Sequence, residues 1–338
     1  MPTIKKPNQH FDATLYTGTG STQSITNAGS FQPDLVWVKN RSGATDHALY
    51  DAVRGTTKQL ESNTTTAETT EATGLTAFGT NGFTIGALAQ MNTSANNYVG
   101  WQWKAGGATT VNTSGTISSN VSVNATAGFS VVTYTGTGAN ATVGHGLGIA
   151  PRMIITFCRS NAGSNHLTYH ASLGNTQCLL LEATSAALTS STFWNNTSPT
   201  SSVFSLGTSG DVNTSGRTYV AYCWAEIAGF SSFGSYTGNG SADGVFVYLG
   251  FRPKFVMIKG TGASVANWNI FDTSRDTYNI EGQYLAANTN DAEGTLGTLD
   301  GLSNGFKIRT NQVFANNSAE TFIYMAFAEA PFKFSNAR

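Results

Sequence analysis

The residues best suited to chemistry in this sequence are a recurring acid–base pair. Tyr50-Asp-Ala-Val-Arg54 and Phe271-Asp-Thr-Ser-Arg275 share one pattern, in which an aspartate precedes an arginine by three residues. The corresponding stretch Tyr169-His-Ala-Ser-Leu173 carries neither charge. A carboxylate and a guanidinium at this spacing can pair with each other or with a ligand. We expect Asp51–Arg54 and Asp272–Arg275 to steady loops, with a ligand or partner contact as the alternative.

The histidines give weaker patterns. His145 stands directly before Gly146-Leu-Gly, and we expect it to cap a turn there, with a ligand contact as the alternative. His166 and His170 flank Tyr169, but the remaining histidines are far away in the sequence. A metal site built on two histidines is therefore disfavoured, and we expect no bound metal.

Known catalytic patterns are missing from the sequence. There is no Gly-x-Ser-x-Gly elbow with a matching histidine, and no carboxylate pair stands out for glycoside hydrolysis. No Gly-Lys-Ser/Thr follows the glycine-rich stretches, which argues against a phosphate loop. Cys158, Cys178 and Cys223 are too widely spaced for a disulfide framework or a zinc site and suggest buried thiols. We expect a non-enzymatic protein without catalytic residues or cofactors.

The elements that must position these residues occur three times along the chain. Each copy begins with a Tyr-Thr-Gly motif and reaches a proline 17 residues after the tyrosine, followed by a nearly unbroken apolar run. The copies begin at Tyr16, Tyr134 and Tyr236, and their prolines are Pro33, Pro151 and Pro253. Each copy ends on an aromatic strand, at Tyr98–Trp103, Tyr219–Trp224 and Phe322–Phe327. Shared offsets in three copies predict an internal triplication.

The repeat length sets the predicted domains. A copy spans about 100 residues, which suits a domain and is too long for a solenoid repeat. We predict domains at 1–105 with a short N-terminal arm, at 106–228 with a leading polar strand or linker, and at 229–338. In each motif, we expect both glycines, such as Gly18 and Gly20, to supply positive φ for a turn.

The local patterns are those of strands. Runs of four to eight residues rich in Val, Ile, Phe, Tyr and Thr alternate with Gly, Asn and Ser clusters, and long helical periods are hard to find. The predicted fold is all-β, with three tandem antiparallel β-sandwich domains of jelly-roll-like type. The run after each proline is apolar on both faces, so we place it centrally in its sheet. Most of the aromatic residues lie inside predicted strands and are expected in the core.

Charge is scarce in the composition. The 338 residues include 18 Lys+Arg and 19 Asp+Glu, a charged fraction of 11%, against about 25% in ordinary soluble chains. The surface polarity must come from the 48 Thr, 32 Ser and 29 Asn residues. The near-zero net charge argues against nucleic-acid binding, and no apolar stretch is long enough to insert in a membrane as a helix. The N-terminus has no apolar run behind its two lysines, so we expect no conventional signal peptide.

Two stretches resemble a repeat unit of virion proteins from tailed bacteriophages, marine phages especially. They are Gly128–Gly138 and Val143-Gly-His-Gly-Leu-Gly-Ile-Ala-Pro-Arg-Met-Ile-Ile155. Lys39-Asn-Arg41 and Ala328-Glu-Ala-Pro-Phe-Lys333 resemble the same family. The resemblance extends over all three copies, although the His-Gly-Leu-Gly run occurs only in the second. Proteins of this family are usually described as tail-fibre or other structural proteins.

The resemblance implies a structural component of a bacteriophage virion, assembled in the host cytoplasm and carried on the mature particle. We favour a tail-fibre or adhesin-type protein that contacts a glycan or protein of the host surface. The alternatives are a capsid decoration, cement or head-fibre protein and, more remotely, a glycan depolymerase. The expected partners are other virion proteins (capsid, portal or tail) and further copies in a homotrimer. Lys5, Lys6 and Pro7 in the N-terminal arm are candidates for attachment to the virion.

Overall fold

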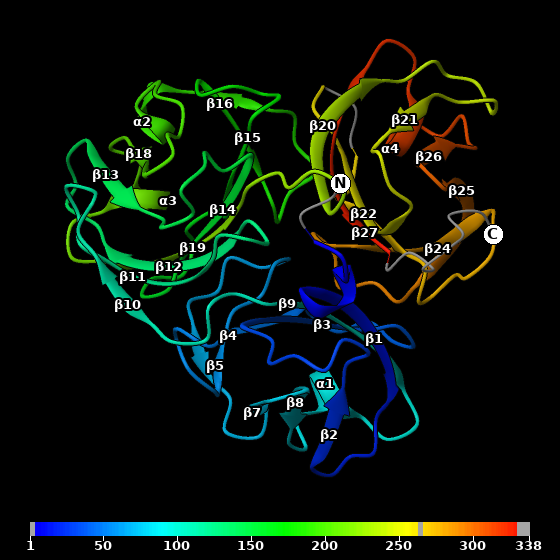
Figure 1. The fold of residues 1–338 in the computed structure, drawn as a ribbon, viewed down its shortest axis with the longest axis horizontal. Helices are drawn as coiled ribbons and strands as arrows, with labels where there is room; N and C mark the ends of the chain where they lie inside the picture. Colours follow the sequence, from blue (N-terminus) through cyan, green and yellow to red (C-terminus); the bar gives the residue numbers. More distant parts are fainter. Residues whose placement is uncertain (1–3, 263–265, 330–338) are drawn as a thin grey trace.

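The computed structural model, which describes residues 4–262 and 266–329, has three lobes around a common centre (Figure 1). The regular structure in these ranges is almost entirely antiparallel β-sheet, with helices of only three or four residues. The prediction of an all-β antiparallel fold is therefore confirmed. We call residues 4–105, 106–228 and 229–329 segments I, II and III. Whether each segment folds by itself stays a prediction.

Segment I consists of two sheets that enclose an apolar core. The strands of the larger sheet follow the order β1 (Phe11–Thr17), β9 (Asn97–Trp103), β3 (Leu35–Asn40) and β4 (Ala48–Asp51). The smaller sheet has the order β2 (Gln23–Thr26), β8 (Gly82–Ile85) and β7 (Leu75–Gly79). The remaining elements are η1 (Pro7–Gln9), β5 (Lys58–Gln59), β6 (Thr69–Thr70) and α1 (Ala89–Asn92).

Segment II repeats this strand order and extends it. Its larger sheet is β10 (Thr110–Asn112), β11 (Ser119–Asn124), β12 (Phe129–Thr135), β19 (Thr218–Trp224), β14 (Met153–Cys158), β15 (Leu167–His170), β16 (Gln177–Leu180) and β17 (Leu188–Thr189). Opposite lie β13 (Ala141–Gly144) and β18 (Val203–Leu206), with short helices α2 (Ser191–Trp194) and α3 (Gly210–Asn213). The polar stretch that leads this segment therefore contains strands.

Segment III contains a single sheet that curls around its own core. Its order is β20 (Ser231–Thr237), β27 (Thr321–Ala328), β22 (Pro253–Gly260), β23 (Asn269–Asp272), β24 (Glu281–Ala286), β25 (Gly294–Leu302), β26 (Gly305–Ile308) and β21 (Phe246–Tyr248). Helix α4 (Val313–Asn316) precedes the last strand. The first four strands follow the order of β1-β9-β3-β4 and of β12-β19-β14-β15, so three stretches of the chain share one arrangement.

The repeated Tyr-Thr-Gly motif stabilises one corner of each segment. Gly20 has φ +70°, as predicted, but Gly18 is required for another reason. A Cβ atom at Gly18 would lie 2.1 Å from the carbonyl oxygen of Thr93, so only glycine lets the two backbones approach. The expectation of positive φ was wrong for this first glycine of the motif. The motif tyrosine, Tyr16, donates a hydrogen bond to the carbonyl of Met91 at 2.9 Å.

A buried asparagine in the short helix before each closing strand holds the same corner. In segment II, Asn213 Oδ1 accepts the N–H of Thr137 at 2.8 Å, and its Nδ2 donates to the carbonyls of Ala139 and Gly207 at 2.6 and 2.8 Å. Asn92 and Asn316 make the corresponding contacts in segments I and III. Each side chain satisfies three backbone groups, one of them in a fully buried contact, which fixes the loop after the first strand.

The three segments also share one core. A single apolar cluster contains residues of all three, and β9, β19 and β27 contribute Trp103, Trp224 and Phe327 at equivalent positions. The ring centroid of Trp103 lies 5.9 Å from that of Trp224 and 5.8 Å from that of Phe327. Each large sheet therefore buries one face in its own segment and the other against its neighbours. This explains the predicted runs that are apolar on both faces, since all residues of β3 and β14 are buried.

Candidate functional site

The first predicted acid–base pair lies where segment I meets segment II. Asp51 at the end of β4 pairs with Arg54, and both side chains are fully buried. The hydroxyl group of Tyr222 in β19 donates a hydrogen bond to Asp51 Oδ2 at 2.8 Å. Arg54 Nη2 in turn donates to the Tyr222 oxygen at 3.2 Å. The pair therefore joins two segments, in addition to steadying the loop after β4.

The second pair joins segment III to segment I in the same way. Arg275 Nε lies 2.6 Å from Asp272 Oδ2, which also accepts a hydrogen bond from Trp101 Nε1 at 3.0 Å. The Arg275 guanidinium lies 5.7 Å from the centre of the Trp101 ring. Burial alone would raise the pKa of Asp272, but the charge and hydrogen bonds of Arg275, together with the hydrogen bond from Trp101, outweigh it and lower the pKa. The carboxylate stays charged in the interior because its partners compensate the lost hydration.

The third boundary, between segments II and III, has lost both sides of this network. His170 and Leu173 occupy the places of the acid and the base, and Met325 takes the place of Trp101 and Tyr222. His170 Nε2 donates instead to the carbonyl oxygen of Tyr324 at 3.1 Å. A thioether offers no N–H or O–H to a carboxylate, so the loss of the charged pair accompanies the loss of its partner.

A second set of contacts, at the periphery of the molecule, also joins each segment to the next. The backbone N–H of Glu68 donates to the carbonyl of Arg159 at 2.9 Å, and the two side chains form an ion pair at 2.8 Å. Glu293 and Arg41 repeat both contacts between segments III and I. At the third boundary, the N–H of Ala187 donates to the carbonyl of Thr261 at 3.0 Å, and no ion pair of the described residues accompanies this contact. Each segment therefore contacts the next in one rotational sense, and the third returns to the first.

His145 lies in the interior of segment II and uses both ring nitrogens. Its Nδ1 accepts the backbone N–H of Leu147 at 3.2 Å, and its Nε2 lies 3.1 Å from the carbonyl oxygen of Thr200. The side chain is fully buried, and burial lowers its pKa. These contacts are those of a turn cap, and they leave its role as a ligand contact without structural support.

The N-terminal arm is partly docked onto the protein. Ile4 belongs to the shared core, and Pro7 is buried at the start of η1. Lys5 and Lys6 are exposed between them. Of the three residues predicted for virion attachment, only the two lysines therefore present their side chains to a partner. In the resembling stretch Ala328–Lys333, residues 330–333 lie outside the described residues.

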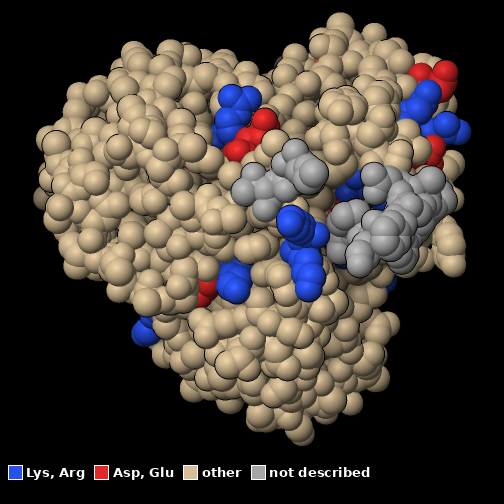
Figure 2. Space-filling view, in the orientation of Figure 1, with Lys and Arg blue, Asp and Glu red and all other residues tan. Residues whose placement is uncertain are grey.

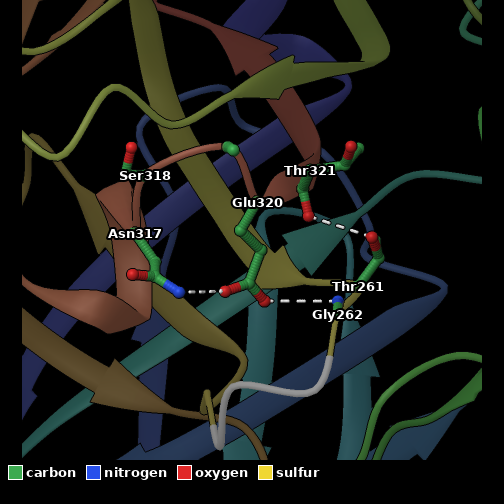
Figure 3. Close-up of a pocket in the computed structure, with 7 residues that line it drawn as sticks. Thr261, Gly262, Asn317, Ser318, Glu320 and Thr321 are labelled. Carbon is green, nitrogen blue, oxygen red and sulfur yellow. Dashed lines mark hydrogen bonds between the residues drawn. The ribbon is translucent and has the colours of Figure 1, made fainter.

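A shallow surface pocket in segment III offers polar groups but no free acid. It lies between the end of β22 and the start of β27 (Figure 3). Glu320 Oε2 accepts a hydrogen bond from Asn317 at 2.9 Å, and Glu320 Oε1 accepts the N–H of Gly262 at 3.2 Å. The carboxylate therefore serves to fix the loop. The pocket is shallow, and its acid is already engaged, so it lacks the enclosed, mostly apolar cavity of a typical small-ligand site.

The most unusual surface is an exposed aromatic face on segment III, formed by Phe246 and Tyr248 of β21. Both rings point outward, with 46% and 68% of their residue areas exposed. Tyr278, in the loop before β24, is 82% exposed. Among the described residues, these are the only aromatic side chains of the exposed class. The expectation that most aromatics lie in the core holds for the described residues, and these three positions are its clearest exceptions.

Charged groups accompany the aromatic face. Lys307 in β26 lies opposite Phe246 and forms an ion pair with Asp243 at 2.6 Å. Arg309 lies 3.6 Å from Asp300, the residue opposite Lys307 in β25. Much of the face in Figure 2 is uncharged, and its charged residues gather near the centre and at the outer edge of segment III. Aromatic rings and matched ion pairs therefore occur together on one sheet.

Sequence reasoning missed this face because Phe246-Val-Tyr248 has the appearance of an ordinary core strand. The available signal was the comparison of copies. Val247 pairs with Phe306, as Ile25 pairs with Phe83 in segment I and Val143 with Phe204 in segment II. Since neighbouring residues in a strand face opposite ways, the flanking aromatics must face outward.

Other groups also bear on function. Cys158, Cys178 and Cys223 are free and buried, as expected. Within residues 4–262 and 266–329, no three or more His, Cys, Asp or Glu side chains are arranged to hold a metal ion. None of the helices in these ranges has the length and apolar character to cross a bilayer.

Comparison with known proteins places the chain in a family without assigning an activity. No curated protein matches it. A family model described as "Domain of unknown function (DUF7483)" matches residues 6–331, so this match extends over all three segments. The chain therefore belongs to the DUF7483 family.

Proposed function

We propose that this protein is a non-enzymatic structural component of a bacteriophage virion, of tail-fibre or adhesin type, that contacts the host surface. The virion assignment rests on the resemblance of the Tyr-Thr-Gly and His-Gly-Leu-Gly stretches to phage structural repeats. The contact role rests on one observation, the aromatic face of segment III. Exposed rings gathered on one sheet cost solubility without adding to the core, and they are typical of binding surfaces.

The interior supports a structural role. The charged groups at the boundaries already pair with one another and join the segments. Asp51 pairs with Arg54, and Asp272 pairs with Arg275. The surface draws its polarity from Thr, Ser and Asn, which makes it insensitive to salt and poor in tryptic sites. Both properties suit a protein that works outside the cell on a particle.

The ring of segments bears on the proposed assembly. Three related faces are already buried within one chain, so no homotrimer is needed to cover them. The homotrimer stays a prediction and would have to use other surfaces, such as the exposed lysines of the arm. The aromatic face remains available in either assembly.

The test has two parts. Purified phage particles are examined by mass spectrometry for this chain, and the purified protein is added to host cells and to expanded capsids. We expect the chain in mature particles and binding to cells. Binding to capsids without binding to cells would replace the adhesin with a decoration protein. Absence of the chain from particles would refute the virion assignment.

A further inference from the structure

We infer that the aromatic face of segment III binds a neutral polysaccharide through Phe246 and Tyr248. The inference rests on the proposed contact role and adds the place and the ligand class. Phe246 and Tyr248 are two residues apart in β21, so their Cα atoms are about 7 Å apart and their side chains lie on one side of the sheet. Two exposed aromatic side chains are therefore neighbours on one surface that a ligand can reach.

The other segments act as internal controls. Strand pairing aligns Phe246 with Ser24 and Thr142, and Tyr248 with Thr26 and Gly144. In segment I, the Ser24 hydroxyl bonds that of Thr84 at 3.0 Å and needs no partner. In segment II, Thr142 is covered by Thr116, with two hydrogen bonds of 2.8 and 2.9 Å. The fold therefore accepts small polar residues at these positions, and the rings serve something other than folding.

The neighbours of the two rings leave them accessible. Gly305 of β26 lies opposite Tyr248 and is required by the backbone, because a Cβ atom there would lie 2.0 Å from the carbonyl oxygen of Val247. The same Cβ atom would lie 3.1 Å from Phe246 Cε2, so the glycine also leaves room for the Phe246 ring. Tyr278 is tied to β25 of the same sheet, because its neighbour Asn279 bonds both backbone groups of Gly301 at 2.9 and 3.1 Å.

The charges beside the rings select the class of ligand. Lys307 pairs with Asp243, and Arg309 lies near Asp300, so each cation on the face is matched by a carboxylate. A nucleic acid or a strongly anionic polymer needs unmatched cations. A protein partner favours an interface centre depleted of charge. A sugar ring has an apolar C–H face that stacks on an aromatic ring, and its hydroxyls both donate and accept hydrogen bonds. The face supplies the rings and, beside them, both kinds of polar group.

The test replaces Phe246→Ser and Tyr248→Thr together, which copies Ser24 and Thr26 of segment I. The matched control is Val111→Thr, at a position 68% exposed in segment II. Full-length proteins are applied to a microarray of bacterial surface polysaccharides. They are also applied to host cells treated either with periodate, which cleaves sugar diols, or with protease. Circular dichroism verifies the fold of each variant.

We expect wild-type protein and Val111→Thr to bind the array and the protease-treated cells. Neither protein should bind the periodate-treated cells. The double variant should lose about tenfold or more in affinity, because both stacking contacts are removed. Unchanged binding by the double variant overturns the inference. Binding that protease abolishes and periodate spares also overturns it, in favour of a protein receptor, and leaves the adhesin role intact. Failure of wild-type protein to bind any glycan overturns the inference even if the chain is found in particles.

Discussion

Replacing Arg54 with leucine should strongly destabilise the protein, although leucine is the residue that segment II carries at the same place. Arg54 bonds Asp51 and Glu68, the carbonyls of Lys58 and Leu49, and the Tyr222 hydroxyl. Glu68 keeps Arg159 in the variant. Asp51 keeps only the Tyr222 hydroxyl and backbone N–H groups, and its charge is left buried without a cation. A buried pair broken on one side costs about 3–5 kcal/mol.

Urea unfolding followed by tryptophan fluorescence measures this loss, since all six tryptophans are buried. The triple variant Asp51→His, Arg54→Leu and Tyr222→Met copies the natural boundary between segments II and III. It should recover part of the loss, because no buried carboxylate remains. Arg309→Leu, at a side chain 38% exposed, is the control and should change stability by less than about 1 kcal/mol. A loss below about 1 kcal/mol for Arg54→Leu would refute the claim that this network joins the segments.

Three further predictions concern the interior. Gly18→Ala should cost about 1–3 kcal/mol in urea unfolding, because its Cβ meets the Thr93 carbonyl, whereas Gly43→Ala, whose nearest neighbour is at 3.6 Å, should be nearly neutral. Asn213→Ala should cost about 1–3 kcal/mol by leaving the buried Gly207 carbonyl and two partly buried backbone groups without their partner. Equal stability of Asn213→Ala and the exposed-site control Asn140→Ala would contradict this. Burial lowers the pKa of His47 to about 3 and those of His166 and His170 to about 4, and each ring bonds a carbonyl of another segment. Because the unfolded chain takes up these protons below about pH 6.5 and the folded protein does not, stability should fall as pH drops from about 6.5 toward 4. Thermal melts across this range that show no decline would contradict the neutral, interface-bound state of these histidines.

The sequence was most informative about local structure. Tyr16, Gly20 and the apolar runs signalled strands and turns because their chemistry is decided within a few residues. The strand Leu35–Asn40 was recognisable as buried on both faces, but burial alone does not say what covers a face. The cover is contributed by the other segments, more than 100 residues away, which no local pattern encodes.

At the candidate site too, the sequence predicted local features but not the contacts between segments. The Asp51–Arg54 and Asp272–Arg275 pairs were identified from spacing, but their partners Tyr222 and Trp101 were not, because those contacts cross segments. Most aromatics were expected in the core, and nothing in the sequence singled out Phe246 and Tyr248, because a strand that alternates aromatic and aliphatic residues has an apolar residue on either face. Which face is covered depends on the sheet packing against it, and the outer face of β21 carries exposed rings.

Locating segment III on the virion is the most direct test of the proposed contact between the aromatic face and the host. Antibody fragments are selected that bind wild-type protein but do not bind the Phe246→Ser, Tyr248→Thr variant. They would mark the aromatic face on intact particles in electron micrographs. We predict that they decorate a defined structure of each particle and block its adsorption to host cells. Particles that contain the chain but remain unlabelled and fully adsorbing would contradict the claim that this face contacts the host.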